Sequence, residues 1–351
     1  MIRDKEKKIS LLKRIKRKIL FWFHLTNKPV IKLYNGYGND SMVTVFGHVF
    51  KVSPLPRKKY RKNFINNTYG MFRLFMVKRF VNATLQMRWD GVAYEARTQD
   101  DGFFKFEWTP SCPLPPGWHP VKVHLQLPGS KSNPVEAMGE FFIPYKYEYA
   151  FISDIDDTFL ISHSSSLRKR MYVLLTKNAR SRKPFEGVVN HYQLLASTGA
   201  SRNTYNMFFY VSSSEWNLYD YIFEFARKNK LPKGIYLLNQ LKTFRQVFKT
   251  GQNNHKTKFM RITRIMEAYP SQKFILLGDD SQEDPNIYAA VVEHFPQNVY
   301  AIYLRHVLKS NFGKVSEIVE KIRATGIPCC YFTHSAAAVI HSKKIALIPD
   351  A

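Results

Sequence analysis

Acidic side chains crowd the ends of two short apolar segments of this chain. They are Asp154, Asp156 and Asp157 after residues 149–153, and Asp279, Asp280 and Asp284 after residues 273–277. Alternation along an extended segment places Asp154 and Asp156 on one side, about 7 Å apart. Carboxylates this close repel one another, and a hard divalent cation with oxygen ligands relieves the repulsion. An isolated acidic pair would indicate only a turn, but two such clusters together predict a cation site.

Serines and a lysine add groups that bind anions. Residues 212–214 are all serine; they follow the apolar segment 207–211 and precede a helix predicted to begin near Trp216. Hydroxyl groups and free amides at a helix N-terminus suit an anion, although capping alone also explains serines there. Lys256 precedes the helix that leads to the second acidic cluster; a lone lysine would be a solvated surface residue. Together these residues supply a nucleophile, an acid/base, a metal clamp and hydrogen-bond donors, the set that phosphoryl transfer needs.

The elements that must position these residues form a repeating pattern of short apolar segments and helical stretches. The apolar segments are 149–153, 207–211, 273–277 and 299–303, and the helical stretches are 187–198, 216–229, 257–269, 286–294 and 312–325. Buried strands alternating with helices predict an α/β fold with a parallel sheet covered on both faces. In such sheets ligands bind beyond the carboxyl ends of the strands, which is where the acidic and serine clusters stand.

Before Pro144 the pattern changes to short alternating segments separated by turn residues. These segments are 43–49, 84–89, 103–106 and 121–127. Repeated short strands with Gly and Pro between them predict an antiparallel β-sandwich, in which Asp100 and Asp101 shape a hairpin. We therefore expect three parts: a basic segment at 1–28, a β-sandwich domain at 32–145 and an α/β domain at 146–351.

The composition favours anionic partners without choosing among them. The 351 residues include 53 Lys and Arg against 27 Asp and Glu, a formal charge of +26. Such an excess of positive charge attracts the protein to anionic partners, which include phospholipid surfaces, nucleic acid and small phosphorylated molecules. Three cysteines cannot form a disulfide framework, which favours a reducing, cytoplasmic setting. No apolar run reaches the about 18 residues of a membrane-spanning helix.

Two basic segments are candidates for contact with a membrane. Between Arg3 and Lys18 there are nine basic residues, and the apolar positions Leu12, Ile15, Ile19 and Trp22 fall at helical spacing. This pattern is typical of an interfacial anchor and predicts peripheral contact through residues 1–25 on the inner face of the membrane. The alternatives are a helix docked on the body and a solvated tail. Residues 162–182 form a second basic stretch, interpreted either as a headgroup-facing surface or as a solvated helix.

The motif residues resemble those of the haloacid dehalogenase superfamily. The matching positions are Asp154, Asp156 and Thr158 for the Asp-x-Asp-x-Thr motif, Ser212 for the second motif, Lys256 for the third, and Gly278, Asp279 and Asp284 for the fourth. The resemblance implies a Rossmann-like haloacid dehalogenase domain over 146–351, preceded by the antiparallel β-sandwich domain.

A closer resemblance, from about Tyr147 to the C-terminus, is to the actin-patch-associated phosphatidate phosphatase family and its bacterial relatives. Family members carry segments like 151–158, 184–188, 210–219 and 274–288 of this chain. Their usual Gly-Asp-Ser-Gly is replaced here by Gly-Asp-Asp-Ser at 278–281. This departure leaves open which of Asp279, Asp280 and Asp284 touch the metal directly.

The resemblance implies a role for each matching residue. Asp154 is the nucleophile and Asp156 is the acid/base. A magnesium ion is held by Asp154, the backbone carbonyl of Asp156, Asp279 and Asp284. Ser212 and Ser213 bind phosphoryl oxygens, Lys256 neutralises their charge, and Thr158 fixes the turn beside the substrate. The implied enzyme is a magnesium-dependent phosphatase of a phosphatidate-like lipid phosphate, acting through an aspartyl phosphate.

Two alternatives stay open. The same chemistry would serve nucleic-acid ends or a soluble phosphorylated metabolite, because the charge of +26 suits these anions too. A non-enzymatic membrane-binding module with a relict pocket is the second alternative. The complete acidic, serine and lysine set argues against it.

Overall fold

A computed structural model describes residues 25–26, 28–54, 74–127, 135–145, 149–160, 183–199, 206–241 and 254–349. The basic helix predicted within residues 1–25 lies almost wholly outside these ranges, and the basic stretch 162–182 lies outside them entirely. Both therefore stay predictions. Among the helices of the described ranges, none is long and apolar enough to cross a membrane.

The site is carried by a parallel sheet of six strands, in the order β13-β12-β11-β14-β15-β16. Their bounds are β11 (Tyr149–Ser153), β12 (Met207–Glu215), β13 (Ile235–Asn239), β14 (Lys273–Asp279), β15 (Val299–Arg305) and β16 (Cys329–Phe332). The four predicted strands are confirmed, and the structure adds β13 and β16 at the edges. Strands β11 and β14 pair in the middle of the sheet, and both are buried on both faces, as their unbroken apolar runs predict.

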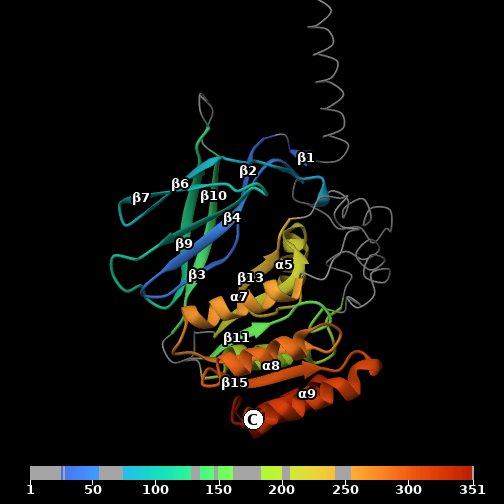
Figure 1. Ribbon diagram of the computed structural model, residues 1–351. Coiled ribbons are helices and arrows are strands. Elements are labelled where there is room, and N and C mark those ends of the chain that lie inside the picture. Colours follow the sequence, from blue (N-terminus) through green and yellow to red (C-terminus); the bar gives the residue numbers. More distant parts are fainter. Residues whose placement is uncertain are drawn as a thin grey trace, which may run out of the picture.

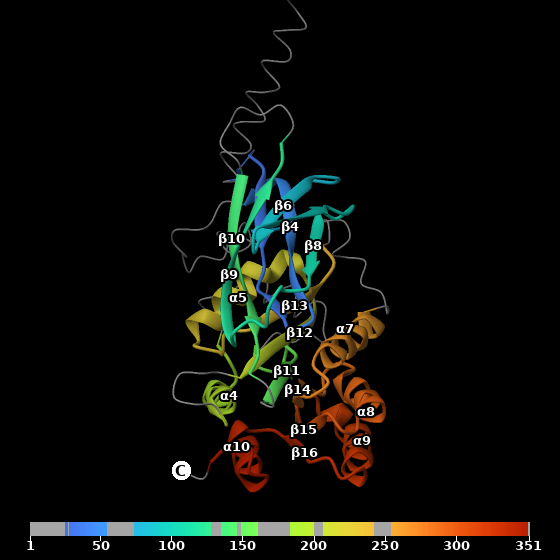
Figure 2. The same cartoon turned by 90° about the vertical axis from the view of Figure 1, so that its left-hand side faces the viewer.

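Helices cover the two faces of this sheet. Their bounds are α4 (Val188–Ser197), α5 (Tyr219–Lys228), α7 (Asn254–Ala268), α8 (Asp284–His294), α9 (Phe312–Ala324) and α10 (Ser335–Lys344), with short 3-10 turns η1 (Trp216–Leu218) and η2 (Lys309–Asn311). Figure 2 shows α7, α8 and α9 along one face and α4 with α10 on the other. The predicted helices all form within a few residues of their expected bounds, and α10 is additional. The α/β class is therefore confirmed.

The N-terminal part forms a mainly antiparallel sheet (Figure 1). Its strands are β1 (Leu25–Thr26), β2 (Val30–Leu33), β3 (Gly36–Gly38), β4 (Val43–Pro54), β5 (Lys78–Arg79), β6 (Thr84–Trp89), β7 (Val92–Arg97), β8 (Phe103–Trp108), β9 (Gly117–Leu125) and β10 (Val135–Ile143). They connect into one ten-stranded sheet because the long β4 pairs with β1, β2, β3, β5 and β8. The predicted antiparallel strands are confirmed, and their inward side chains form a separate apolar cluster.

The turn predicted at Asp100 and Asp101 forms, because the Gln99 amide donates a hydrogen bond of 2.8 Å to the Phe103 carbonyl and the Gly102 amide donates one of 2.9 Å to the Gln99 carbonyl. Asp101 helps to shape this turn, because its carboxylate accepts a hydrogen bond of 2.9 Å from the Phe103 amide. The strands on either side of the turn have other partners: β7 pairs with β6, and β8 pairs with β4. The turn residues were recognisable in the sequence, whereas the choice of partner strand depends on distant segments.

The two sheets pack on each other through aromatic side chains and buried polar contacts. Tyr34 and Phe46 belong to the same apolar cluster as the parallel sheet. Asn35 donates a hydrogen bond of 2.9 Å to the Gly234 carbonyl, and the Tyr269 hydroxyl donates one of 2.9 Å to the Gly38 carbonyl. The predicted boundary at 145/146 falls between β10 and β11, while the domain limits themselves stay predictions.

Candidate active site

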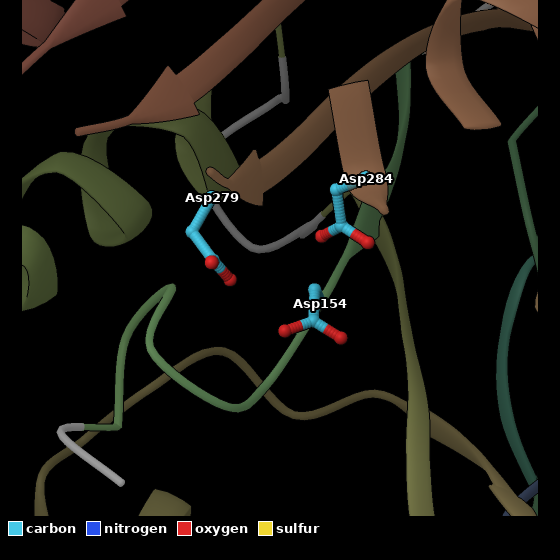
Figure 3. Close-up of side chains that lie close together, drawn as sticks. All are labelled: Asp154, Asp279 and Asp284. Atoms are coloured by element: carbon cyan, nitrogen blue, oxygen red, sulfur yellow. The ribbon is translucent and has the colours of Figure 1, made fainter. Parts of the chain in front are cut away.

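Three aspartates converge at the carboxyl edge of the parallel sheet. Asp154 follows β11, Asp279 ends the neighbouring strand β14, and Asp284 begins α8. One carboxylate oxygen of each lies within 4.8 Å of the others, and all three residues are buried. Figure 3 shows the three side chains close together, with those of Asp279 and Asp284 pointing toward Asp154. The Asp154 amide donates a hydrogen bond of 2.8 Å to the Leu277 carbonyl, so the pairing of β11 with β14 fixes this geometry.

A buried lysine from α7 lies among these carboxylates. The Lys258 ammonium nitrogen is 2.6 Å from Asp154 Oδ1 and 2.5 Å from Asp284 Oδ1. Burial disfavours the charge on Lys258, but the two carboxylates outweigh it and raise the pKa of this lysine. The motif pattern in the sequence predicts Lys256 at this place. The side chain of Lys256 lies outside the described residues, and the lysine that the structure brings to Asp154 is Lys258.

Fully ionised, the three carboxylates would carry more negative charge than one lysine offsets. The pKa of Asp154 is raised to about 8, because burial and repulsion from Asp284 together outweigh the opposing effect of the Lys258 ammonium. Burial also raises the pKa of Asp279, with repulsion from Asp284 and Asp154 adding to the effect. A cation placed between them would favour their ionised forms, as nearby positive charge does in general.

Two features of the site fit a small divalent cation. Asp284 Oδ2 is buried and has no hydrogen-bond partner among the described residues. Gly278 lies beside this oxygen and has no side chain. A Cβ atom at position 278 would lie only 2.6 Å from Asp284 Oδ2, so the glycine keeps the space next to the carboxylate free. Three carboxylates offer the hard oxygen ligands that magnesium prefers.

Asp280 is occupied elsewhere, although it neighbours Asp279 in the sequence. Its carboxylate accepts hydrogen bonds from His306 Nδ1 at 2.6 Å, from the Tyr331 hydroxyl at 2.6 Å and from the Val307 amide at 2.7 Å. Of the aspartates left open by the sequence analysis, Asp279 and Asp284 therefore stand with Asp154.

Thr158 links the two strand ends. Its hydroxyl lies 3.0 Å from Asp279 Oδ2 and 3.4 Å from Asp154 Oδ2, in donating geometry to both. The turn that returns it to the cluster has Asp157 at a φ of 59°, in the left-handed region. This geometry agrees with the expected role in fixing the turn. A direct contact with substrate stays a prediction.

The serine run lies beside Asp156. The Ser214 hydroxyl donates to Asp156 Oδ2 at 2.6 Å, and Ser212 donates to the same oxygen at 3.4 Å. Ser212 Oγ also accepts a hydrogen bond of 2.9 Å from the Ser214 amide. The structure thus unites the expected acid/base with Ser212, and Ser214 is a contact that the sequence analysis missed. Ser213 is the most exposed of the three serines, and its role in substrate binding stays a prediction.

Arg305 is a second residue that the sequence analysis missed. It is 2% exposed and ends β15, paired in register with Asp279. Its Nε donates to the Thr158 carbonyl at 3.0 Å, and its Nη2 donates to Ser335 Oγ at 2.9 Å. Burial lowers the pKa of Arg305 to about 10, so the group stays charged at neutral pH. A basic residue at the end of a predicted strand was the available signal.

The C-terminal part of the chain is similar to known proteins. Residues 149–306 match the family described as phosphatidate phosphatase APP1, catalytic domain. The chain is 26% identical over 189 residues to phosphatidate phosphatase APP1 of Saccharomyces cerevisiae, covering 53% of this chain and 31% of that protein. It is 21% identical over 174 residues to an uncharacterised protein of Schizosaccharomyces pombe, covering 49% and 27%. The chain thus spans less than a third of the length of these curated relatives.

Among solved structures, a carbohydrate acetylesterase from Xanthomonas citri aligns with 91% of this chain and 75% of its own. The sequence identity is 9% and the TM-score is 0.33. A score this low does not establish a shared fold.

Replacing Lys258 by methionine (Lys258→Met) should reduce stability because it leaves buried carboxylates without their counter-charge. Breaking a buried ion pair in this way costs about 3–5 kcal/mol, measurable as the free energy of unfolding in urea. The matched control is Lys105→Met, which removes an exposed pair with Glu107 and should cost at most about 1 kcal/mol. Equal losses in the two variants would contradict the role given to Lys258.

Adding a methyl group at Gly278 (Gly278→Ala) should weaken binding of a divalent cation, because Asp284 must move away. We expect a loss of about tenfold or more, typical for changes next to metal ligands, in a calorimetric titration with magnesium or manganese. The control is Gly313→Ala, where the added Cβ meets nothing within 4 Å. Unchanged affinity at Gly278→Ala, or no binding by the wild type, would argue against the cation site.

Proposed function

We propose that the protein is a magnesium-dependent phosphatase of phosphomonoesters, because residues 149–306 match the family described as phosphatidate phosphatase APP1, catalytic domain. The observation that carries the proposal is the convergence of Asp154, Asp279 and Asp284 around Lys258. Within this proposal the parallel sheet is a haloacid dehalogenase-type domain, since the first acidic motif follows the central strand β11 and the last follows its neighbour β14.

Asp154 is the proposed nucleophile. An oxygen of its carboxylate attacks phosphorus, the bond from phosphorus to the ester oxygen breaks, and an aspartyl phosphate forms. Lys258 at Oδ1 and Thr158 at Oδ2 hold the carboxylate in one orientation, which supports attack from a fixed position. The positive charge of Lys258 also reduces repulsion between the carboxylate and the incoming phosphate.

Asp156 is the proposed acid/base. In the first step it gives its proton to the leaving alcohol oxygen, and in the second it takes a proton from the water that attacks the aspartyl phosphate. The overall result is one alcohol and one inorganic phosphate, with Asp154 and Asp156 regenerated. The hydroxyls of Ser214 and Ser212 on Asp156 Oδ2 orient this carboxyl group. Ser212 and Ser213 are proposed to bind phosphoryl oxygens.

Magnesium would be held by Asp154, Asp279 and Asp284, with the backbone carbonyl of Asp156 as a further proposed ligand. A bound ion would offset the negative charge that the phosphate adds to these carboxylates. Arg305, hydrogen-bonded to the Thr158 carbonyl, adds a fixed positive charge behind the turn and holds the residues between Asp154 and Thr158 in place.

The proposed substrate is a phosphatidate-like lipid phosphate, because the relative with an established name is a phosphatidate phosphatase. The formal charge of +26 suits an anionic phospholipid surface, and peripheral contact through residues 1–25 on the cytoplasmic face of a membrane is part of the proposal. Nucleic-acid ends and soluble phosphorylated metabolites are the alternative substrates. A module that only binds membranes is the non-enzymatic alternative.

Asp154→Asn should lower the rate of phosphate release by on the order of a thousandfold or more, as removal of a nucleophile does in other enzymes. The assay compares phosphatidate vesicles, phosphorylated oligonucleotides and small phosphate esters, each with magnesium and with a chelator. We expect release from the vesicles, dependent on magnesium. Asp220→Asn is the matched control, because it removes a surface carboxylate that is 61% exposed.

Substantial activity of the Asp154→Asn variant, with the fold intact by circular dichroism, would overturn the nucleophile assignment. Preference for an oligonucleotide or a small ester over the vesicles would replace the lipid substrate but keep the chemistry. Release of phosphate from none of the substrates by the wild type would favour the non-enzymatic alternative.

A further inference from the structure

An aromatic side chain next to the serine run is held by the N-terminal sheet. The indole of Trp216 stacks on the ring of Tyr34, with ring centroids 4.1 Å apart and planes inclined by 16°. Trp216 is 7% exposed and Tyr34 is 1% exposed. The Phe46 ring lies edge-on to the same indole at 5.9 Å. Trp216 therefore follows a strand of the parallel sheet in the sequence, but its ring packs against side chains of the N-terminal sheet.

Trp216 is close in the chain to the groups that contact Asp156. It follows directly on β12, and Ser214 lies two residues before it, about 7 Å along an extended strand. The next residue, Asn217, donates a hydrogen bond of 3.0 Å to the Leu74 carbonyl of the N-terminal part. Two successive residues at the end of the serine strand are thus attached to the N-terminal part.

Tyr34 is itself rigidly supported. Its hydroxyl is 3.0 Å from His48 Nδ1, and the His48 ring stacks on Phe50 and meets Phe103 edge-on. Burial lowers the pKa of His48 and raises the pKa of Tyr34, so both are neutral and their contact carries no net charge. Protein interiors are packed as densely as crystals of small organic molecules. The Tyr34 ring therefore cannot shift without displacing the side chains around it.

We propose that Tyr34 is a positioning residue of the active site. Through its stack on Trp216, the N-terminal sheet sets the place of Ser212 and Ser214 against Asp156, so the two sheets act as one catalytic unit. Aromatic pairs of this kind contribute beyond the burial of their surface. The effect on catalysis rests on the proposed function, whereas the mechanical coupling of Tyr34 to the serine strand does not.

The test compares Tyr34→Ala with Tyr34→Phe and Tyr269→Ala. Phenylalanine keeps the stack on Trp216 but loses the hydroxyl contact with His48, so it should cost some stability while leaving residues 212–217 and kcat as in the wild type. Tyr269 is the matched control because it is 4% exposed, packs between the same two sheets and donates its hydroxyl to the Gly38 carbonyl. Its aromatic neighbours are Tyr37 and Phe209 rather than Trp216. Phe209 lies near the start of β12, so removal of Tyr269 should cost stability without loosening residues 212–217 at the other end of that strand.

The first readout is hydrogen exchange of backbone amides, followed by mass spectrometry of peptides from β12 and η1. Tyr34→Ala should speed exchange at residues 212–217 by about tenfold or more while β11 and β14 keep their protection, since local opening is decided by local packing. Tyr34→Phe and Tyr269→Ala should leave this region as in the wild type. Unchanged exchange in Tyr34→Ala would overturn the proposal, whatever the activity of the protein.

The second readout is steady-state hydrolysis of phosphatidate vesicles with magnesium. Tyr34→Ala should lower kcat about tenfold with KM within about threefold, because the lost interaction acts on the transition state, and Tyr269→Ala should keep both. Equal losses of kcat in the two alanine variants, in proportion to their melting temperatures, would reduce Tyr34 to a structural role and overturn the proposal. A wild type without any phosphatase activity would refute the proposed function alone, and the exchange experiment would still decide the coupling.

Discussion

The mutual repulsion of three buried carboxylates is the constraint on which this structure depends. Asp154, Asp279 and Asp284 share a space from which water is largely excluded, and charges repel more strongly there than in water. Lys258 neutralises one of the three negative charges, and Thr158 donates toward two of the carboxylates. A bound cation would offset the negative charge that Lys258 leaves unbalanced. The same surplus of negative charge would oppose a phosphate unless positive charge were supplied with it.

The parallel sheet carries the residues of this site, and the N-terminal sheet packs against one of its strands. Pairing of β11 with β14 brings the first and last acidic motifs together, and α7 and α8 add Lys258 and Asp284 from one face. The serine strand β12 ends against Asp156, and its last residues lead into the aromatic contact between Trp216 and Tyr34. The N-terminal sheet is therefore in direct contact with an element of the candidate site, although it holds no member of the acidic cluster.

Much of this arrangement could be predicted from the sequence because it follows from local patterns. Unbroken apolar runs marked β11, β12, β14 and β15, and the rule for carboxyl ends of parallel strands predicted where Asp154 and Asp279 would meet. The short edge strands β13 and β16 were missed, since five and four residues with little flanking signal do not stand out.

The details that the sequence did not predict depend on which side of a helix or strand a residue lies, or on contacts between distant segments. Lys256 and Lys258 are both near the start of α7, and a sequence alone does not say which face of the helix is turned toward the strand ends. Neighbouring residues at a strand end point to opposite sides, and only the contacts of Asp280 with His306 and Tyr331 show which of two adjacent aspartates serves the cluster. Arg305 contacts the carbonyl of Thr158 across 147 residues of chain, a separation that no local pattern spans.

The most direct test of the central claim is a crystal structure determined with manganese, whose anomalous scattering identifies the position of the ion. We expect an anomalous peak within coordination distance of Asp154, Asp279 and Asp284, with Lys258 still hydrogen-bonded at the edge of the cluster. A map without a peak at these three carboxylates, from crystals in which the cluster is intact and manganese is in large excess, would contradict that claim.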